Sequence, residues 1–293
     1  MPFLRREHFF FLVVAYGFSW TMWVSAWLLA RRSGVDLVFN EELVWTALFE
    51  EGSLAPLLGV SGLALLAVYG PLLAGFLASA VDPTTSRQDL YRRMRLVRVG
   101  SAWYLRALLI LIAVTAVPAL ALAALTGLAS DAPTLPRLGV FLVVFFVFQL
   151  VTAGLEEPGW RGYLLDRLLP GRSLWDAGWA VGVPWALWHL PVVLILFAQQ
   201  GMEPVLMLTS FLGFGIGIVA MSILHTWFYA NTNSVFLAIV IHAAFNTVPL
   251  AAGFILASGS YVAAVASQLS LWAVVILITK RAEKAETAAD LSP

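Results

Sequence analysis

The chain consists of long apolar segments separated by short segments that carry most of its charges. Each apolar segment is close to the roughly 20 residues that a helix needs to cross the hydrocarbon core of a bilayer. Prolines interrupt the second and fifth segments, which membrane helices tolerate where neighbours satisfy the freed carbonyls. The pattern therefore predicts an all-α transmembrane bundle with eight spans, over residues 9–30, 54–81, 103–127, 138–159, 177–197, 205–229, 235–256 and 262–279.

The basic residues between the spans predict the orientation of the bundle, because cytoplasmic loops are enriched in Lys and Arg. With the N-terminus inside, every basic residue except Arg31, Arg32 and Arg137 falls on the inner side. The segment between the first two spans is instead acidic and falls outside. We therefore expect both termini in the cytoplasm, and Glu156 and Glu157, at the end of the fourth predicted span, on the cytoplasmic side.

Composition supports a membrane protein and excludes several other classes. Hydrophobic residues make up 61% of the chain and charged residues 12%, and the mean hydropathy is +0.88; a soluble chain of this length could not cover its surface with so few polar residues. The formal net charge is zero, so no basic patch for nucleic acid is expected, and with no cysteine there is no disulfide, thiolate metal site or cysteine nucleophile. The bias toward Ala, Leu, Val and Arg suggests a multi-pass protein of a bacterial plasma (inner) membrane.

A pair of carboxylates, Glu156 and Glu157, follows the apolar run of the fourth span. Glu157 and Arg161 are four residues apart, so on a helix they can form an ion pair. Glu156 points about a quarter turn away and is left for another role. The alternative is a charged helix end at the membrane interface, without any chemistry.

Histidines and an amide occur inside later spans. His189 follows Trp185 by one helical turn, and His242 and Asn246 lie four residues apart on one face of the seventh span. Each can also be a structural polar group that joins two helices. His225 could be a site residue or an interfacial histidine. Together, a carboxylate and two histidines can hold or deprotonate a water, and a histidine and an asparagine can donate hydrogen bonds to an oxyanion. These are the groups that the hydrolysis of an amide bond uses.

The motifs occur in the order Glu-Glu-x-x-x-Arg, aromatic-x-x-x-His and His-x-x-x-Asn. In this order and at these separations they resemble the CPBP (CAAX protease and bacteriocin-processing, or Abi) family of intramembrane proteases, which includes the type II CAAX prenyl endopeptidases. Two features depart from the family pattern. Trp185 stands where phenylalanine is usual, and Pro158 and Gly159 follow the carboxylates, where they can break the helix.

The resemblance implies a peptidase, a hydrolase that cuts an internal bond of a membrane-associated, CAAX-like peptide or protein near the cytoplasmic face. It implies that Glu156 is the general base and that His189 helps to hold the water. His242 and Asn246 would stabilise the oxyanion, and Glu157 and Arg161 would form a supporting pair.

The family has been described both as metal-dependent and as using glutamate without a metal. Glu156, His189 and His242 would suit Zn²⁺, so both mechanisms stay open. The resemblance divides the chain into residues 1–137, with the first three spans; 138–256, the catalytic core; and 257–293, with the last span and a short cytoplasmic tail.

Two other functions are compatible with the same residues. A non-catalytic immunity or scaffold protein would keep this fold without turnover. A transporter would use intramembrane polar residues as a pathway, but the sequence shows no internal repeat of the transporter kind. The zinc His-Glu-x-x-His motif, an intramembrane aspartyl pair and a rhomboid-like Gly-x-Ser-x motif are all absent from the sequence.

Overall fold

A computed structural model describes residues 6–53, 58–84, 86–126, 135–256 and 261–290. Within these ranges every regular element is a helix, which confirms the predicted all-α bundle. Short 3-10 or π turns, named η, interrupt several helices. The expected start of the second span, the end of the third at Gly127, and the extreme termini lie outside the described residues. The first half contains α1 (Arg6–Ser33), α2 (Asn40–Trp45), η1 (Thr46–Glu50), α4 (Val60–Leu66), η2 (Ala67–Tyr69), α5 (Gly70–Val81), α6 (Arg87–Met94), α7 (Ser101–Leu111), η3 (Ile112–Ala116) and α8 (Val117–Thr126).

The second half contains the elements that carry the predicted chemistry. They are α9 (Leu135–Val151), η4 (Ala153–Glu156), α10 (Glu157–Gly159), η5 (Trp160–Leu165), α11 (Asp166–Leu168), α12 (Leu174–Trp188), α13 (Leu190–Gln199), α14 (Pro204–Thr232), α15 (Val235–Leu256) and α16 (Tyr261–Asp290).

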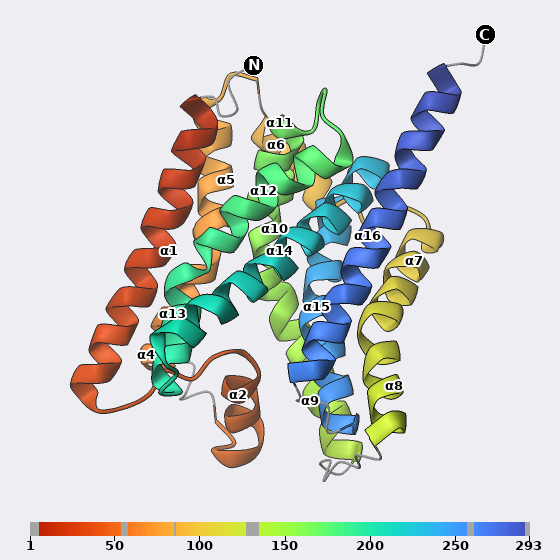
Figure 1. The fold of residues 1–293 in the computed structure, drawn as a ribbon. Coiled ribbons are helices and arrows are strands. Elements are labelled where there is room, and N and C mark those ends of the chain that lie inside the picture. Colours follow the sequence, from red (N-terminus) through yellow and green to blue (C-terminus); the bar gives the residue numbers. More distant parts are fainter. Residues whose placement is uncertain (1–5, 54–57, 85, 127–134, 257–260, 291–293) are drawn as a thin grey trace.

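Among the described residues, six helices are long and apolar enough to cross a membrane. The α12–α13 pair, which is bent by 43°, makes a seventh if it counts as one span. The apolar part of α15, Val235–Leu250, is shorter than these six helices. The long helices run alternately up and down, so the start of α1 and the end of α16 lie at the same end of the bundle (Figure 1). This arrangement agrees with an even number of crossings, but the count of eight and the cytoplasmic placement of the termini stay predictions.

Glycines allow helices to approach closely around the centre of the bundle. A Cβ atom on Gly159 would lie 2.1 Å from the carbonyl oxygen of Pro71 on α5, and one on Gly178 would lie 2.6 Å from the side chain of Ile223. Only residues without a side chain permit such contacts, as in other membrane helix pairs. Consequently α10 is held directly against α5, and α12 against α14.

Polar side chains close one end of the bundle, which we call the arginine-rich end; α6 and α11 lie there (Figure 1). Arg93 is only 3% exposed and pairs with Asp166 at 2.7 Å and Asp89 at 2.9 Å. The hydroxyl of Tyr229 accepts a hydrogen bond from Arg93 and donates one to Asp166. A hydrogen bond from Arg92 lowers the pKa of Asp89. This network fastens α6, α11 and α14 together.

A further carboxylate, Asp82, lies at the same end. Burial alone raises the pKa of Asp82, but hydrogen bonds from Thr84 and the charge of Arg167 outweigh that effect. The pKa of Asp82 is therefore below its ordinary value, and its ionised form stabilises the folded chain.

Candidate active site

The two adjacent carboxylates lie inside the bundle. The structure continues the fourth span to Leu168, and the helical segment Pro136–Leu168 has 33 residues. The helix therefore does not end at Gly159 as predicted, while the depth of the carboxylates in the membrane stays a prediction. Proline is accepted at the start of a helix because the amide it lacks has no partner there, and Pro158 is near the start of α10. Glu156 is 3% exposed and Glu157 is fully buried.

A local break aims the two carboxylates in different directions. Thr152 leaves the helical conformation, with φ −113° and ψ −98°. Its hydroxyl donates a hydrogen bond of 2.7 Å to the carbonyl of Phe148, which satisfies the end of α9. The chain then passes through the 3-10 turn η4, the short helix α10 and the π-helical turn η5. Because Glu156 ends η4 and Glu157 begins α10, neighbours in sequence occupy different environments.

Glu157 has an elaborate set of partners. Nη1 of Arg161 lies 3.0 Å from each oxygen of its carboxylate, and Nδ1 of His242 lies 2.7 Å from Oε1. The guanidinium of Arg161 also stands 4.1 Å from the ring centre of Trp185. The predicted Glu157–Arg161 pair is present even though Pro158 separates its members. Since both residues are fully buried, removing one would leave an uncompensated buried charge.

Glu156 takes part in none of the ion pairs found among the described residues. Its Oε2 accepts a hydrogen bond of 2.8 Å from the indole nitrogen of Trp185. It lines a cavity of about 380 Å³ that Glu157 and Arg161 do not line. Glu157 thus has the predicted cationic partner, whereas the hydrogen bond of Glu156 comes from a neutral indole.

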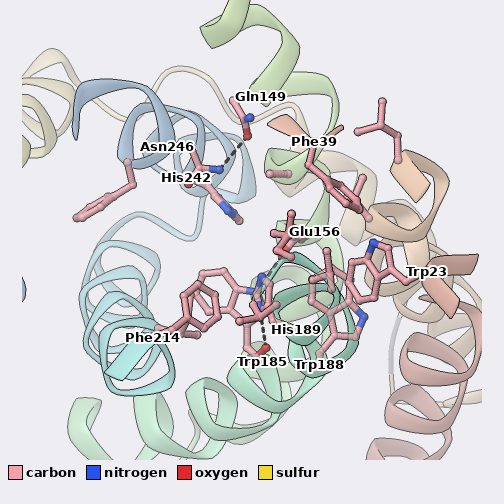
Figure 2. Close-up of a pocket in the computed structure, with 18 of the residues that line it drawn as sticks. Trp23, Phe39, Gln149, Glu156, Trp185, Trp188, His189, Phe214, His242 and Asn246 are labelled. Atoms are coloured by element: carbon pink, nitrogen blue, oxygen red, sulfur yellow. Dashed lines mark hydrogen bonds between the residues drawn. The ribbon is translucent and has the colours of Figure 1, made fainter. Parts of the chain in front are cut away.

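Three more residues predicted for the site line the same cavity: His189, His242 and Asn246. Figure 2 shows them arranged around it together with Glu156. The four residues come from three separate parts of the fold: Glu156 from η4, His189 from the junction of α12 and α13, and the other two from α15. Apart from Gln149 and Glu41, the rest of the wall is aromatic or aliphatic, with residues such as Trp23, Phe145, Trp188, Phe214 and Phe245.

The hydrogen bonds of the two histidines fix their tautomers. Nδ1 of His189 lies 2.8 Å from the carbonyl oxygen of Trp185, and a carbonyl can only accept, so Nδ1 carries the proton. Nδ1 of His242 donates in the same way to the carboxylate of Glu157. In both rings Nε2 is therefore the basic nitrogen. Neutral His242 cannot donate from Nε2, so its predicted role at an oxyanion requires the protonated ring.

Comparison with known proteins supports the sequence pattern. Residues 138–248 match the family model described as type II CAAX prenyl endopeptidase Rce1-like. We call this part of the chain the Rce1-like region. The similarity to CPBP-type intramembrane proteases is thereby confirmed. A protein named CAAX prenyl protease 2, from Methanococcus maripaludis, is 36% identical to this chain over 107 residues. The chain spans only 39% of the length of that relative, and the match covers 36% of this chain.

The Rce1-like region contains every residue that sequence predicted for the site, and also one that it missed. Gln149 on α9 is 1% exposed and lines the cavity. Its Oε1 accepts a hydrogen bond of 2.8 Å from Nδ2 of Asn246 (Figure 2). Its Nε2 is buried with no hydrogen-bond partner among the described residues. The signal was available, because Gln149 is a polar residue in an apolar run, two helical turns before Glu156.

His225, also in the Rce1-like region, lies behind the cavity rather than in its wall. It is fully buried and its Nδ1 bonds the carbonyl of Met221 at 2.9 Å. Its ring centre lies 6.2 Å from that of His242. The interpretation of His225 as an interfacial histidine is therefore wrong, since it packs against the site.

The side chains predicted to hold a metal do not converge in this geometry. Within the described residues of the chain, no three His, Asp or Glu side chains converge closely enough to hold an ion. His242 directs Nδ1 to Glu157, and His189 directs Nδ1 to a carbonyl. As arranged, Glu156, His189 and His242 do not form a three-ligand site, and Zn²⁺ stays an untested expectation.

Proposed function

We propose that this chain is an intramembrane endopeptidase that hydrolyses a peptide bond of a membrane-associated protein or peptide. The observation that carries the proposal is the meeting of Glu156, His189, His242 and Asn246 in one cavity with apolar walls. Membrane proteins rarely bury such groups without a functional use. The match of residues 138–248 to the Rce1-like family model supports the same reaction class.

In the proposed mechanism, a water is held between Glu156 and Nε2 of His189. Oε2 of Glu156 is bonded to Trp185, so the other oxygen takes a proton from the water. The resulting hydroxide attacks the carbonyl carbon of the peptide bond. Glu156 then returns that proton to the departing amine as the carbon–nitrogen bond breaks. The products are a carboxylic acid and an amine, and no atom is left over.

The oxyanion of the intermediate needs donors that are already in place. Asn246 uses one amide proton for Gln149 and can direct the other into the cavity. His242 contributes when its ring is protonated, a form that the carboxylate of Glu157 stabilises from 2.7 Å. Glu157 and Arg161 therefore act through His242 and do not touch the substrate. No step of this mechanism passes through a metal.

The name of the relative suggests one substrate to test, a prenylated CAAX tail. The plasma (inner) membrane is the proposed location of the protein. The expected cleavage near the cytoplasmic face assumed that Glu156 and Glu157 end their span. The helical segment that contains both residues continues to Leu168, so the side on which cleavage occurs has to be tested separately.

The decisive variant is Glu156→Gln, which keeps a hydrogen-bond acceptor for Trp185 but removes the base. New protein termini in membranes that contain the wild type are compared with those in membranes that contain the variant, and bound metal is measured on both purified proteins. We expect the new termini to vanish in Glu156→Gln, while exposed Glu42→Gln leaves them unchanged. Identical termini in the wild type and Glu156→Gln would overturn the proposal and favour a non-catalytic scaffold or immunity protein.

A further inference from the structure

The cavity lies far from the arginine-rich end of the bundle. His242 is seven residues below the start of α15, or about 10 Å at 1.5 Å per residue. Met221 is eleven residues from the end of α14 at Thr232, or about 16 Å. Both residues line the cavity. The end of α14 is bonded to α11 through Tyr229 and Asp166, and Ser234, just before α15, is bonded to Leu96 after α6.

A layer of buried side chains on η5 and α14 lies between the cavity and that end. Trp160, Leu164, His225 and Phe228 are each no more than 1% exposed and do not line the cavity. Beyond this layer, Arg93 joins α6, α11 and α14 through the network described above. A peptide approaching from the arginine-rich end would have to displace both the layer and the network.

At the opposite end the cavity reaches the surface. Its wall there includes Phe39 and Glu41 from the segment that contains α2, with Leu65 of α4 and Leu196 of α13. Glu41 is exposed, whereas every other lining residue is buried or half-buried. Glu41 therefore marks the entrance. We call this end, where α2 lies in Figure 1, the α2 face.

Hydrogen bonds hold the wall of the entrance in position. The side-chain amide of Gln199 accepts from the backbone nitrogen of Leu37 at 3.3 Å and donates to its carbonyl at 3.1 Å. The backbone nitrogen of Val38 donates to the hydroxyl of Ser61 at 3.0 Å. The segment before α2 is thus tied to both α13 and α4, and Glu41 follows it closely.

The entrance carries negative charge. Residues 34–53 contain five carboxylates, Asp36, Glu41, Glu42, Glu50 and Glu51, and neither Lys nor Arg. The three basic residues expected on this side, Arg31, Arg32 and Arg137, do not line the cavity. An entrance that carries charges of one sign attracts ligands of the opposite charge.

The distribution of arginines assigns the α2 face to the outer side of the membrane. We propose that substrate reaches Glu156 from the extracytoplasmic side, through the α2 face, and that Glu41 binds a basic side chain of that substrate. That the entering molecule is a substrate rests on the proposed peptidase function. The route and the charge preference do not require catalysis, and so they can be tested apart from it.

The absence of native cysteine makes the first test direct. Single cysteines are placed at Glu41 and at Arg92, whose side chain is 66% exposed on α6 at the other end, and spheroplasts are treated with a membrane-impermeant maleimide. We expect Glu41→Cys to react in intact spheroplasts and Arg92→Cys only after lysis. A second pair, Glu42→Cys and Arg95→Cys, repeats the comparison if either variant is poorly produced. The reverse pattern would refute the extracytoplasmic route.

The second test measures access and charge together. Ala153→Cys places a thiol in the cavity wall, and its reaction rates with a cationic and an anionic thiosulfonate reagent are compared in intact spheroplasts. We expect the cationic reagent to react faster. Glu41→Gln should lower the ratio of the cationic to the anionic reaction rate by about three-fold or more, which is the effect of removing one nearby charge in a hydrated entrance. Glu42→Gln is the matched control, because Glu42 is the adjacent exposed carboxylate and does not line the cavity.

The outcomes separate this inference from the peptidase assignment. A thiol at position 153 that reacts only after lysis would overturn the route, and an unchanged ratio in Glu41→Gln would overturn the role of Glu41. Both results can occur in a protein whose Glu156→Gln variant has lost cleavage. Conversely, a chain without peptidase activity can still show outer access with cation preference.

Discussion

Replacing Gln149 with methionine removes the acceptor that holds Asn246 in the cavity wall, while the length of the side chain is nearly unchanged. Asn246 then loses a partly buried hydrogen bond of 2.8 Å, and such a bond contributes about 0.5–1.5 kcal/mol. If the freed amide turns away from the oxyanion, the barrier rises by a similar amount. The expected loss in kcat is therefore about 2- to 13-fold, whereas loss of an oxyanion donor itself, in Asn246→Ala, costs about 100- to 1,000-fold.

The assay is cleavage of a substrate found by comparing protein termini, with kcat and KM measured separately for Gln149→Met, Asn246→Ala and the double variant. Because Gln149 acts through Asn246, we expect the double variant to be no slower than Asn246→Ala, with KM little changed. Thermal unfolding of each purified variant excludes a general loss of structure. Full activity of Gln149→Met, or losses that multiply in the double variant, would refute the positioning role.

Three further changes test the surroundings of the site. Arg161→Leu leaves Glu157 buried without its cation and should destabilise the protein by about 3–5 kcal/mol, read as a lower unfolding temperature. Gly159→Ala puts a Cβ 2.1 Å from the carbonyl of Pro71 and should cost about 1–3 kcal/mol, with a loss of activity because α10 shifts. The lowered pKa of Asp82 means that its stabilising effect is complete above its ordinary pKa of about 3.9 and is lost as pH falls through the lower folded value. The stability difference between wild type and Asp82→Asn should therefore be constant near neutrality and shrink below about pH 4.

Each of these changes has a matched control in the same chain. Arg98→Leu removes an exposed arginine and should leave the unfolding temperature unchanged. Gly139→Ala adds a Cβ with no atom within 4 Å and should be tolerated. Asp176→Asn alters an exposed carboxylate on α12 and serves as the control for loss of a surface carboxylate. A control as damaging as its partner would show that the argument from burial or contact is wrong.

Hydropathy predicted the helices well because each span is a local property of about 20 residues. The first span was expected at 9–30 and is observed as Arg6–Ser33; the sixth was expected at 205–229 and is observed as Pro204–Thr232. The fourth span failed at its end. Pro158 and Gly159 indicated a stop, but the proline lies in the first turn of α10 and the glycine is required against Pro71.

The site was predictable in its main groups and not in their connections. Spacing on a helix indicated the Glu157–Arg161 pair and placed His242 and Asn246 on one face. It could not show that Glu157 also binds His242, because that contact joins positions 85 apart in sequence. Gln149 was overlooked for the same reason, since its partner Asn246 lies on another helix. The segment before α2 was expected to be only an acidic outer loop, and its place in the cavity wall depends on packing against α4 and α13.

The adjacent carboxylates show how one break in a helix can create two chemical roles. In a regular helix, Glu156 and Glu157 would point about 100° apart around the same axis. The conformation of Thr152 and the 3-10 turn after it instead bring Glu156 to the cavity and turn Glu157 toward Arg161 and His242. Glu157 is neutralised by a buried cation, while Glu156 meets only the indole of Trp185. A base needs an oxygen that no cation occupies, and in this pair only Glu156 offers one.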